Sequence, residues 1–303
     1  MKASISKLWL WTRLIAQIIP IFCSDLILKL LQAIFHIVFS RKCKDIKGET
    51  VLVTGAASSI GRQLALQLSG LGCNVICVDS DAEGNMRTAQ VIVKQGYKAQ
   101  AHTCDVTDNT AVEVLAKNVG YVDILINSAG VIYFDPILKT QQAMVSKVLD
   151  INVASHFVMI RNFLPQMLER NKGHIVGIAS CSGLLGVSNA VLYSCSKFAV
   201  VGLMNSLYEE LRHQGRHNIK TSCVCQYFLR VIEGIDNKIE TRIPPLDVED
   251  GVRQIVQGIL QERSMFTVPN HMLALINIGR SVPDSTRNKL RDAVYTRIKP
   301  DAN

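Results

Sequence analysis

The chain has 303 residues, a length that suits one large domain with an appendage better than two independent domains. Apolar residues make up 48% of it and aromatic residues 6%, which allows a sizeable core and excludes an intrinsically disordered chain. The formal net charge is +8, but Lys and Arg are dispersed and are not interleaved with aromatic residues. This pattern favours an anionic membrane surface as a partner and argues against nucleic acid.

Nine cysteines are scattered along the chain, and none of their spacings suggests a metal site. Such a set fits a reducing compartment. Cys223 and Cys225 stand two positions apart in a predicted strand, so they share one face and we expect both to be small core residues. The chain also lacks an Asn-x-Ser/Thr glycosylation acceptor, which agrees with a domain that faces the cytosol.

Residues 8–40 form the most apolar stretch of the chain. Polar residues in its second half recur every three or four positions and so form one narrow stripe along a helix. The residues of this stripe are Asp25, Lys29, Gln32, His36 and Ser40. The first half repeats the pattern, and we expect Pro20 to kink this first half.

Three structures are compatible with this stretch: one helix that spans a membrane, two helices or a shallow hairpin in one leaflet or lipid monolayer, and a soluble helix. The unbroken apolar runs are short for a span and its internal charges are costly, so the shallow arrangement is favoured. No small-residue cleavage site follows, which argues against a cleaved signal peptide. Because the segment 41–47 is basic and positive flanks stay cytoplasmic, we predict that residues 1–47 anchor a domain facing the cytosol.

From Gly48 onward, short β-rich runs alternate with helical segments. This alternation is typical of a doubly wound parallel sheet, so we predict a Rossmann-type α/β domain over residues 48–270. The predicted strands cover 51–54, 75–79, 99–104, 124–127, 174–180, 220–225 and 265–268, and the main helices cover 62–71, 140–170, 190–213 and 247–262. The tail, 271–303, is apolar to Ile278 and then basic, and we expect it to contact the same membrane.

The first predicted strand runs directly into a glycine-containing turn, Thr54–Arg62, which opens a helix. Glycine suits this place because the backbone must turn tightly and approach a pyrophosphate, which the helix N-terminus then holds. A pair of glycines in a turn is weak evidence by itself, so the prediction also depends on the strand ends that follow. The candidate cofactor-binding residues in the turn are Gly55, Ser58, Ser59, Ile60 and Gly61.

Polar residues also stand at the ends of the next three predicted strands. The carboxyl ends of parallel strands lie at one edge of a sheet, which is where open α/β sheets bind ligands. Asp79 ends the second strand about twenty residues after the turn, where a carboxylate can accept hydrogen bonds from the adenosine ribose. The further candidates for cofactor binding follow the third and fourth strands: Asp105, Val106, Asn127, Ala129 and Gly130.

NAD is predicted in preference to NADP. The neighbourhood of Asp79 reads Asp79-Ser80-Asp81 and contains no Arg or Lys. Two carboxylates at this place would repel the 2′-phosphate that distinguishes NADP.

Tyr193 and Lys197 are i,i+4 neighbours on one face of a predicted helix. A free tyrosine has a pKa near 10, and a fixed ammonium together with a cationic nicotinamide ring favours phenolate and lowers that pKa. Ser180 ends a predicted strand and can hydrogen-bond a substrate oxygen, and Asn152 can hold a water that relays protons through Lys197. A Tyr-x-x-x-Lys pair is common by chance, but together with the dinucleotide site it predicts an oxidoreductase.

These residues resemble the short-chain dehydrogenase/reductase family, classical type, over about 48–270. The glycine turn, Asp105, Asn-x-Ala-Gly, Asn152, Ser180 and Tyr-x-x-x-Lys occur in the family's order. Segments 173–176, 193–199 and 220–225 look like the 16C branch, which holds epidermal retinal dehydrogenases and lipid-droplet 17β-hydroxysteroid dehydrogenases.

The resemblance implies hydride transfer between NAD and a lipophilic alcohol such as retinol or a steroid. It also implies attachment to the endoplasmic reticulum membrane or to lipid droplets. A homodimer through the helices at 140–170 and 190–213 is a further expectation that comes from the family alone.

The chain departs from the family at four positions near the cofactor: Ser59 replaces the middle glycine, Ser128 the second Asn, Gln226 a proline, and Val231 a threonine that contacts the carboxamide. The segment from Asp105 to Asn127 also looks about one helical turn shorter than usual. The family's glycine at the position of Ser59 suggests a backbone conformation that disfavours a Cβ, and a left-handed one would cost about 1–2 kcal/mol. None of these changes touches the predicted catalytic residues. We therefore expect either an active enzyme, with weakened cofactor binding, or a catalytically weak relative that serves as a membrane or lipid-droplet protein.

Overall fold

The computed structural model describes residues 42–230, 239–294 and 296–299. The chain divides into two compact units, Met1–Cys43 and Lys44–Asn303, and the account below concerns the second. The predicted anchor helices over 8–40 and the departure at Val231 lie outside the described residues.

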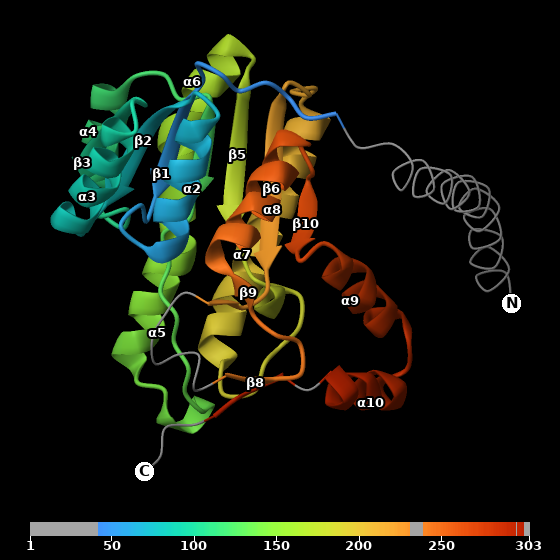
Figure 1. The fold of residues 1–303 in the computed structure, drawn as a ribbon. Helices are drawn as coiled ribbons and strands as arrows, with labels where there is room; N and C mark the ends of the chain where they lie inside the picture. The colour runs from blue at the N-terminus through green and yellow to red at the C-terminus, as the bar shows by residue number, and fades with distance from the viewer. Residues whose placement is uncertain (1–41, 231–238, 295, 300–303) are drawn as a thin grey trace, which may run out of the picture. The chain divides into compact units, whose positions relative to one another are not determined.

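A parallel sheet of seven strands forms the centre of the second unit (Figure 1). Its spatial order is β10-β6-β5-β4-β1-β2-β3, so the strand order reverses between β1 and β4. The strands are β1 (Thr50–Thr54), β2 (Asn74–Asp79), β3 (Ala99–Thr103), β4 (Ile124–Asn127), β5 (Gly173–Ile178), β6 (Ile219–Gln226) and β10 (Met265–Val268). This confirms the predicted doubly wound fold, whose ligand crevice lies at the point of reversal.

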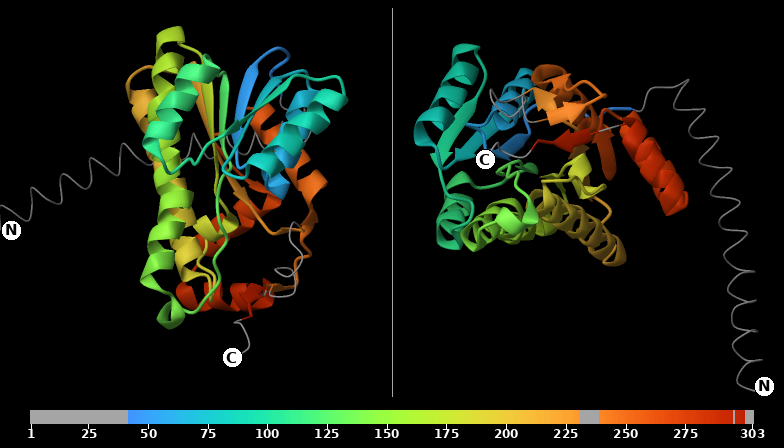
Figure 2. Two further views of the ribbon diagram at one scale, coloured as in Figure 1. Left: turned by 90° about the vertical axis from the view of Figure 1, so that its left-hand side faces the viewer. Right: turned by 90° about the horizontal axis from the view of Figure 1, so that it is seen from below.

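Helices cover both faces of the sheet (Figure 2). One face carries α2 (Ser59–Gly70), α3 (Ala82–Lys94) and α8 (Val248–Leu260), and the other carries α4 (Asn109–Val119), α6 (Ser155–Arg170) and α7 (Val191–His213). Successive strand residues point to opposite faces, so Leu52 belongs to one core cluster while Val51 and Val53 belong to the other. Burial on both faces explains why the strands read as continuous apolar runs.

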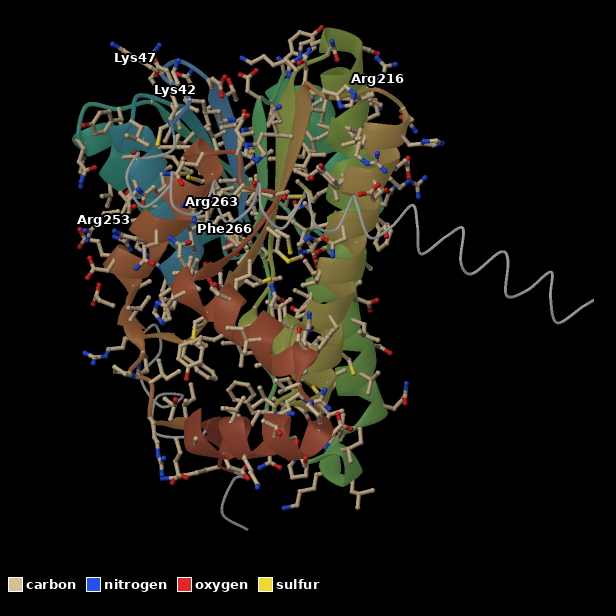
Figure 3. The ribbon with its side chains drawn as sticks, turned by 90° about the vertical axis from the view of Figure 1, so that its right-hand side faces the viewer. Lys42, Lys47, Arg216, Arg253, Arg263 and Phe266 are labelled. Carbon is tan, nitrogen blue, oxygen red and sulfur yellow. The ribbon has the colours of Figure 1, made fainter. Side chains whose placement is uncertain are left out.

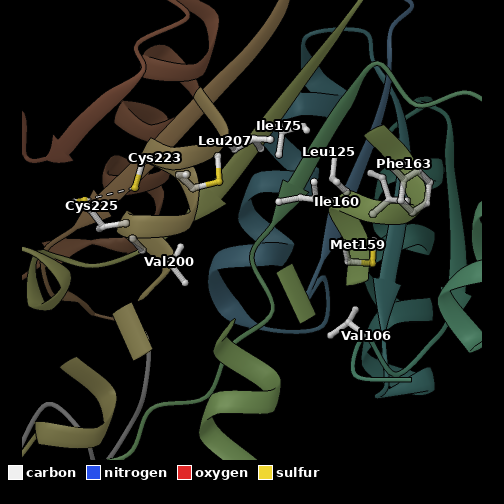
Figure 4. Close-up of a cluster of buried hydrophobic side chains, with 14 of the residues drawn as sticks. Val106, Leu125, Met159, Ile160, Phe163, Ile175, Val200, Leu207, Cys223 and Cys225 are labelled. Atoms are coloured by element: carbon white, nitrogen blue, oxygen red, sulfur yellow. Dashed lines mark hydrogen bonds between the residues drawn. The ribbon is translucent and has the colours of Figure 1, made fainter. Parts of the chain in front are cut away.

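The core under α6 and α7 is shown in Figure 4. Phe163 and Met159 of α6 are buried there with Ile175 of β5. Cys223 and Cys225 belong to the same cluster with their sulfur atoms 4.0 Å apart, which confirms the prediction that both are core residues.

Among the described residues, the helical run Gln142–Arg170 has the length and composition of a membrane span. It comprises α5 (Gln142–Leu149), a π-helical turn (Asp150–Ala154) and α6. Phe163 and Met167 of this run are fully buried in the core. Packing against the sheet therefore accounts for the apolar residues that α6 buries, while Phe157 of the same helix stays 49% exposed.

A chain of polar groups crosses the end of the sheet where the strands begin. The Lys44 Nζ lies 3.1 Å from His174 Nδ1, His174 Nε2 lies 2.9 Å from Ser222 Oγ, and Ser222 donates to the Arg263 carbonyl at 2.6 Å. Because Ser222 donates its proton onward, it accepts from His174 Nε2, which leaves Nδ1 to accept from the ammonium. Lys47 and Arg216 lie at the same end (Figure 3).

Smaller elements surround the opposite end of the sheet, where the strands finish (Figure 1). They are β7 (Leu229–Arg230), β8 (Ile239–Thr241), β9 (Leu246–Asp247), α9 (His271–Ser281), α10 (Asp284–Val294) and β11 (Thr296–Ile298). Met272 and Ile276 of α9 are buried in the core under α7, so the tail is packed on the catalytic unit. The fifth strand ends at Ile178, two residues earlier than predicted, because a short 3₁₀ turn over Cys181–Gly183 begins after Ser180.

His156 of α6 is a buried titratable group with both ring nitrogens lacking a hydrogen-bond partner in the described part of the chain. Burial, with a smaller contribution from the Lys197 ammonium, lowers the pKa of this imidazole to about 3. The unfolded chain therefore takes up a proton near pH 6.5 that the folded chain does not accept. Stability from this group is present above pH 6.5 and is lost as the pH falls toward 3.

We expect His156 to lower the free energy of unfolding by about 2 kcal/mol between pH 7 and pH 5. In His156→Leu, which keeps an apolar side chain but removes the titrating ring, the decrease should be smaller by that amount. Part of the remaining decrease comes from His174, whose pKa burial also lowers. Urea unfolding of the full chain in detergent, followed by circular dichroism, measures both proteins. An equal decrease in the two would contradict the role given to His156.

Candidate active site

The two glycines of the first turn are required by close backbone contacts. Gly55 has φ +71°, and a Cβ there would lie 2.9 Å from Ala129 Cα. A Cβ on Gly61 would lie 2.0 Å from the Gly55 carbonyl oxygen. Glycine therefore allows the turn to pack against the loop after β4 and against the start of α2.

Ser58 holds the turn closed. Its hydroxyl donates to the Gly55 carbonyl at 2.7 Å and accepts from Gly61 N at 3.1 Å, which makes it the N-cap of α2. The first amides of α2, at Ser59 and Ile60, follow this cap at a helix N-terminus that suits an anionic group.

The strain predicted at Ser59 is absent. Ser59 is the first residue of α2, and the non-glycine residues with positive φ among those described are Asn171, Asn189 and Glu262. The prediction of a disfavoured left-handed conformation at this position was wrong, because the residue has already entered the helix. Its side chain is exposed, so the serine adds a hydroxyl at the helix N-terminus without a backbone penalty.

Asp79 lies beside the glycine turn. One carboxylate oxygen accepts the Ala57 amide at 2.9 Å, and the other accepts the Asp81 amide at 2.9 Å. These bonds fix the carboxylate at the end of β2 and leave lone pairs on both oxygens. Asp105, after β3, is fixed in a similar way by Thr107, which donates to one of its oxygens from both its amide and its hydroxyl.

The loop after β4 is held against the glycine turn by Thr54. The Thr54 hydroxyl accepts the amides of Ser128 and Ala129 at 2.9 and 3.0 Å. Asn127 is only 2% exposed, and neither polar atom of its side chain has a partner in the described residues. The Ser128 hydroxyl is also buried, and it too has no hydrogen-bond partner in the described residues.

These features fit a dinucleotide. Unpartnered buried donors and acceptors beside a capped helix N-terminus are groups that a polar ligand can satisfy. The predicted residues Gly55, Ser59, Gly61, Asp79 and Ala129 are brought together at one end of the sheet, whereas Val106 is largely buried in the core.

Tyr193 and Ser180 meet on the same side of the sheet. Their hydroxyls are hydrogen-bonded to one another, and Tyr193 is 8% exposed. The Ser180 hydroxyl also lies 3.3 Å from the Gln226 carbonyl and accepts the Ser182 amide at 3.1 Å. Burial raises the pKa of Tyr193 to about 12, although the bond to Ser180 opposes this. Without a cofactor, the protein therefore keeps the tyrosine protonated at neutral pH.

Lys197 lies one helical turn beyond Tyr193, with its Nζ 5.7 Å from the centroid of the tyrosine ring. The ammonium donates to the Ile178 carbonyl at 3.0 Å. Burial lowers its pKa to about 8. Gly130 faces this group, since a Cβ there would lie 3.5 Å from the Nζ and 3.3 Å from Asn152 Oδ1.

Asn152 lies in the π-helical turn between α5 and α6. Its Oδ1 accepts the Val131 amide at 2.7 Å, and its Nδ2 donates to the Val131 carbonyl at 2.9 Å and to Ser196 Oγ at 3.0 Å. The side chain thus joins the loop after β4 to α7, the helix that carries Tyr193 and Lys197. Asn152 and Lys197 therefore meet at Gly130, with Tyr193 one helical turn from Lys197, while the water relay assigned to Asn152 stays a prediction.

Sequence reasoning missed three positioning residues. The sequence places Thr54 in the turn, but it does not predict the hydrogen bonds from the loop after β4 to the Thr54 hydroxyl. Ser196 receives a bond from Asn152, and a Cβ on Gly183 would lie 2.5 Å from the Lys197 carbonyl oxygen. Each acts through contacts between distant segments, which a local pattern does not reveal.

A doubly wound sheet with a glycine turn at the reversal point and a Ser-Tyr-Lys-Asn set beside it defines a nicotinamide-dependent oxidoreductase. A sequence profile of the family described as short chain dehydrogenase matches residues 49–233. The chain belongs to this family.

Curated relatives match most of the chain. It is 38% identical to short-chain dehydrogenase/reductase family 16C member 6 of Bos taurus, covering 82% of this chain and 81% of that protein. It is 36% identical to epidermal retinol dehydrogenase 2 of Mus musculus, covering 88% of each. It is 32% identical to 17-beta-hydroxysteroid dehydrogenase 13 of Homo sapiens, covering 84% and 86%.

Two solved structures show the same fold with either cofactor. A metagenomic short-chain oxidoreductase in complex with NADP aligns with a TM-score of 0.62 at 28% identity, over 74% of this chain and 98% of that one. An enzyme of the family from Burkholderia phymatum in complex with NAD aligns with a TM-score of 0.70 at 24% identity, over 86% and 99%. The likeness supports a nicotinamide cofactor, and the choice between NAD and NADP depends on this chain's own residues.

Proposed function

We propose that the protein is an NAD-dependent enzyme that interconverts an alcohol and a carbonyl on a lipophilic substrate such as a retinoid, a steroid or a related lipid. The observation that carries the proposal is the arrangement of Tyr193, which is hydrogen-bonded to Ser180 and lies one helical turn from Lys197. This arrangement belongs to the same unit as a glycine turn whose surroundings fit a dinucleotide. The names of the relatives, a retinol dehydrogenase and a hydroxysteroid dehydrogenase, support the choice of substrate class.

Each catalytic side chain has a distinct role in this proposal. When bound, the nicotinamide supplies or accepts the hydride. Ser180 hydrogen-bonds the substrate oxygen, and Tyr193 donates a proton to that oxygen in reduction and removes it in oxidation. Lys197 keeps a positive charge near the phenol at pH 7, since its pKa of about 8 is above that pH. Asn152 fixes the loop on which Gly130 meets the ammonium.

The apolar side chains packed around Tyr193 support a lipophilic substrate. The edge of the Phe134 ring meets the Tyr193 ring at a centroid distance of 5.9 Å. The remaining side chains of the same cluster are those of Val187, Ala190, Phe228, Ile239 and Ile298. A substrate whose oxygen reaches Tyr193 therefore places its carbon skeleton against aliphatic and aromatic groups.

Tyr193→Phe keeps the ring and its packing but removes the exchangeable proton. We expect turnover to fall at least about 100-fold, as is usual when a general acid–base group is lost. NADH formation from retinol and from estradiol by membranes carrying the protein measures the effect. Tyr208→Phe is the matched control, because Tyr208 is an exposed tyrosine on the same helix. A near-normal rate for Tyr193→Phe would overturn the assignment.

The preference for NAD is assigned to Asp79, which is held between two backbone amides at the end of β2. A carboxylate at this place can accept hydrogen bonds from the adenosine ribose. Asp79→Ala removes both the repulsion of a 2′-phosphate and the acceptor for a ribose hydroxyl. The ratio of kcat/KM for NAD to that for NADP should fall by roughly tenfold or more. Asp81→Asn is the control: it removes a neighbouring charge but keeps a good cap for α3. An equal change in both variants would mean that net charge alone decides the preference.

We further propose attachment of residues 1–47 to the endoplasmic reticulum membrane or to lipid droplets, with the catalytic unit facing the cytosol. Deletion of residues 1–40 should release the protein into the soluble fraction, because the striped helices supply the apolar area that a bilayer buries. Flotation of the full and shortened chains with lipid measures this. If the shortened chain still floats, the exposed Leu275 and Ile278 of α9 are the alternative attachment.

The second candidate function is that of a catalytically weak membrane or lipid-droplet protein. Gln226 favours it, because its side-chain oxygen is buried with no partner among the described residues, at a position where the family usually has proline. The unstrained Ser59 weakens this candidate. Titration of the purified full chain with NADH separates the two functions, since the second requires little or no binding.

A further inference from the structure

A pocket with a volume of about 330 Å³ lies at the end of the sheet where the strands begin, between the last turns of α7, the start of β6 and the turn after α8. Tyr208 lines it and follows Tyr193 by fifteen residues on the same helix, so a rise of about 1.5 Å per residue places the two about 22 Å apart. The pocket is therefore separate from the active site. Its basic lining residues are Arg212, which pairs with Glu209, and Arg216, His217 and Lys220.

Positive groups outnumber negative ones in the lining of this pocket. The Glu262 carboxylate lies 3.6 Å from Lys220 Nζ and 3.8 Å from Lys44 Nζ, so two ammoniums share it. In the parts of the chain that the structure describes, Arg216 and His217 form no ion pair. The pocket therefore carries a net positive charge that a bound anion neutralises.

Thr221 of β6 adds a buried polar group to the lining. The residue is 5% exposed, and its hydroxyl oxygen has no hydrogen-bond partner within the described ranges. Thr221 stands between Ile219 and Cys223 at the two-residue spacing of a strand, so it faces the same layer under α7 as they do. A buried hydroxyl without a partner is costly, and an anionic oxygen that accepts its proton removes this cost.

These groups fit a phosphate in character and in size. A guanidinium fork binds phosphate oxygens in pairs, and an ammonium adds a point charge. The volume is at the lower end of the range for small-molecule pockets, so it admits a headgroup but not the acyl chains of a lipid.

The pocket also lies next to the residue at which the proposed anchor joins the catalytic unit. Lys44 is the first residue of that unit, and its amide donates to the Leu260 carbonyl at the end of α8 at 2.9 Å. Residues 41–43 separate Lys44 from the apolar segment 8–40. An extended chain spans at most about 3.5 Å per residue, so this connection reaches no further than about 14 Å. A lipid surface that buries the apolar segment is therefore within reach of the pocket.

We propose that this pocket binds the phosphate headgroup of an anionic phospholipid, with Arg216, Lys220 and Thr221 as its contacts. The chemistry that the pocket recognises is that of a phosphate monoester, and the lipid surface is the source assigned to it. The inference rests on the proposed attachment of residues 1–47 to a membrane or lipid droplet. It adds a headgroup contact to an attachment that otherwise depends on apolar area.

The first experiment tests phosphate binding without a membrane. The purified full chain in neutral detergent is treated with sulfosuccinimidyl acetate, and peptide mass spectrometry follows acetylation of Lys220, with the exposed Lys147 of α5 as reference. Dihexanoylphosphatidic acid should slow acetylation of Lys220 by at least about threefold as the pocket fills, whereas dihexanoylphosphatidylcholine should not. Equal acetylation with the two lipids would overturn the proposal.

Two variants at the same end of the unit separate the pocket from general attraction. Arg216→Gln removes a lining charge and should raise the concentration of phosphatidic acid that half-protects Lys220 by about tenfold. Lys47→Gln is the matched control, because Lys47 is an exposed cation at the same end but does not line the pocket (Figure 3). Its value should change by less than about threefold. Thr221→Val keeps the shape of the side chain, and we expect a rise of about threefold. Equal changes in Arg216→Gln and Lys47→Gln would contradict a specific pocket.

The second experiment identifies the source of the phosphate. The full chain is bound to preformed vesicles of phosphatidylcholine, with or without phosphatidic acid, and both flotation and acetylation of Lys220 are measured. Slower acetylation on the vesicles with phosphatidic acid, lost in Arg216→Gln and kept in Lys47→Gln, supports the lipid. If inorganic phosphate protects Lys220 while phosphatidic acid in vesicles that carry the chain does not, the ligand is a free phosphate and the lipid assignment fails. If the chain floats with neither vesicle while dihexanoylphosphatidic acid protects Lys220 in detergent, the proposed attachment fails and the phosphate pocket is supported.

Discussion

The close approach of two backbone turns at the reversal of strand order is the constraint on which the site depends. Gly55 leaves room for Ala129, and the Thr54 hydroxyl accepts the amides of Ser128 and Ala129. This contact brings the cofactor turn and the loop after β4 to one place. Asn152 then binds that loop through Val131, and Ser196 extends the connection to α7. The dinucleotide half and the catalytic half thus share one hydrogen-bonded framework.

Burial within this framework shifts the pKa values of Tyr193 and Lys197 in opposite directions. It raises the pKa of Tyr193 to about 12 and lowers that of Lys197 to about 8, because each group loses its charged form on leaving water. The phenol is consequently a proton donor in the protein alone. Proton removal in the oxidative direction would need additional positive charge near the phenol, which an oxidised nicotinamide would supply when bound. The electrostatics therefore couple the acid–base group to the state of the cofactor site.

The fold was predictable, and so was the placement of Tyr193 and Lys197 on one helix, because their signals are local. Alternation of strands and helices defined the sheet, and the i,i+4 spacing placed Tyr193 and Lys197 on one helix face. Strain at Ser59 was predicted wrongly, since a family glycine did not reveal that the helix begins at that residue. The contact of Ile298 with the cluster of Tyr193 joins residues about a hundred positions apart, and no periodic pattern records such a contact. The roles of individual site residues stay predictions.

Apolar residues in the described helices either pack in the core or stay exposed on the surface, and the structure shows which residues do which. In α6 the apolar residues include Phe163 and Met167, which the sheet buries completely. In α9 the apolar residues divide: Met272 and Ile276 enter the core, while Leu275 and Ile278 on the same helix stay more than half exposed. One face of α9 is therefore explained by packing within the chain, and the other presents apolar groups to the surroundings. Hydropathy of the tail alone could not distinguish these faces, because both contribute equally to its average.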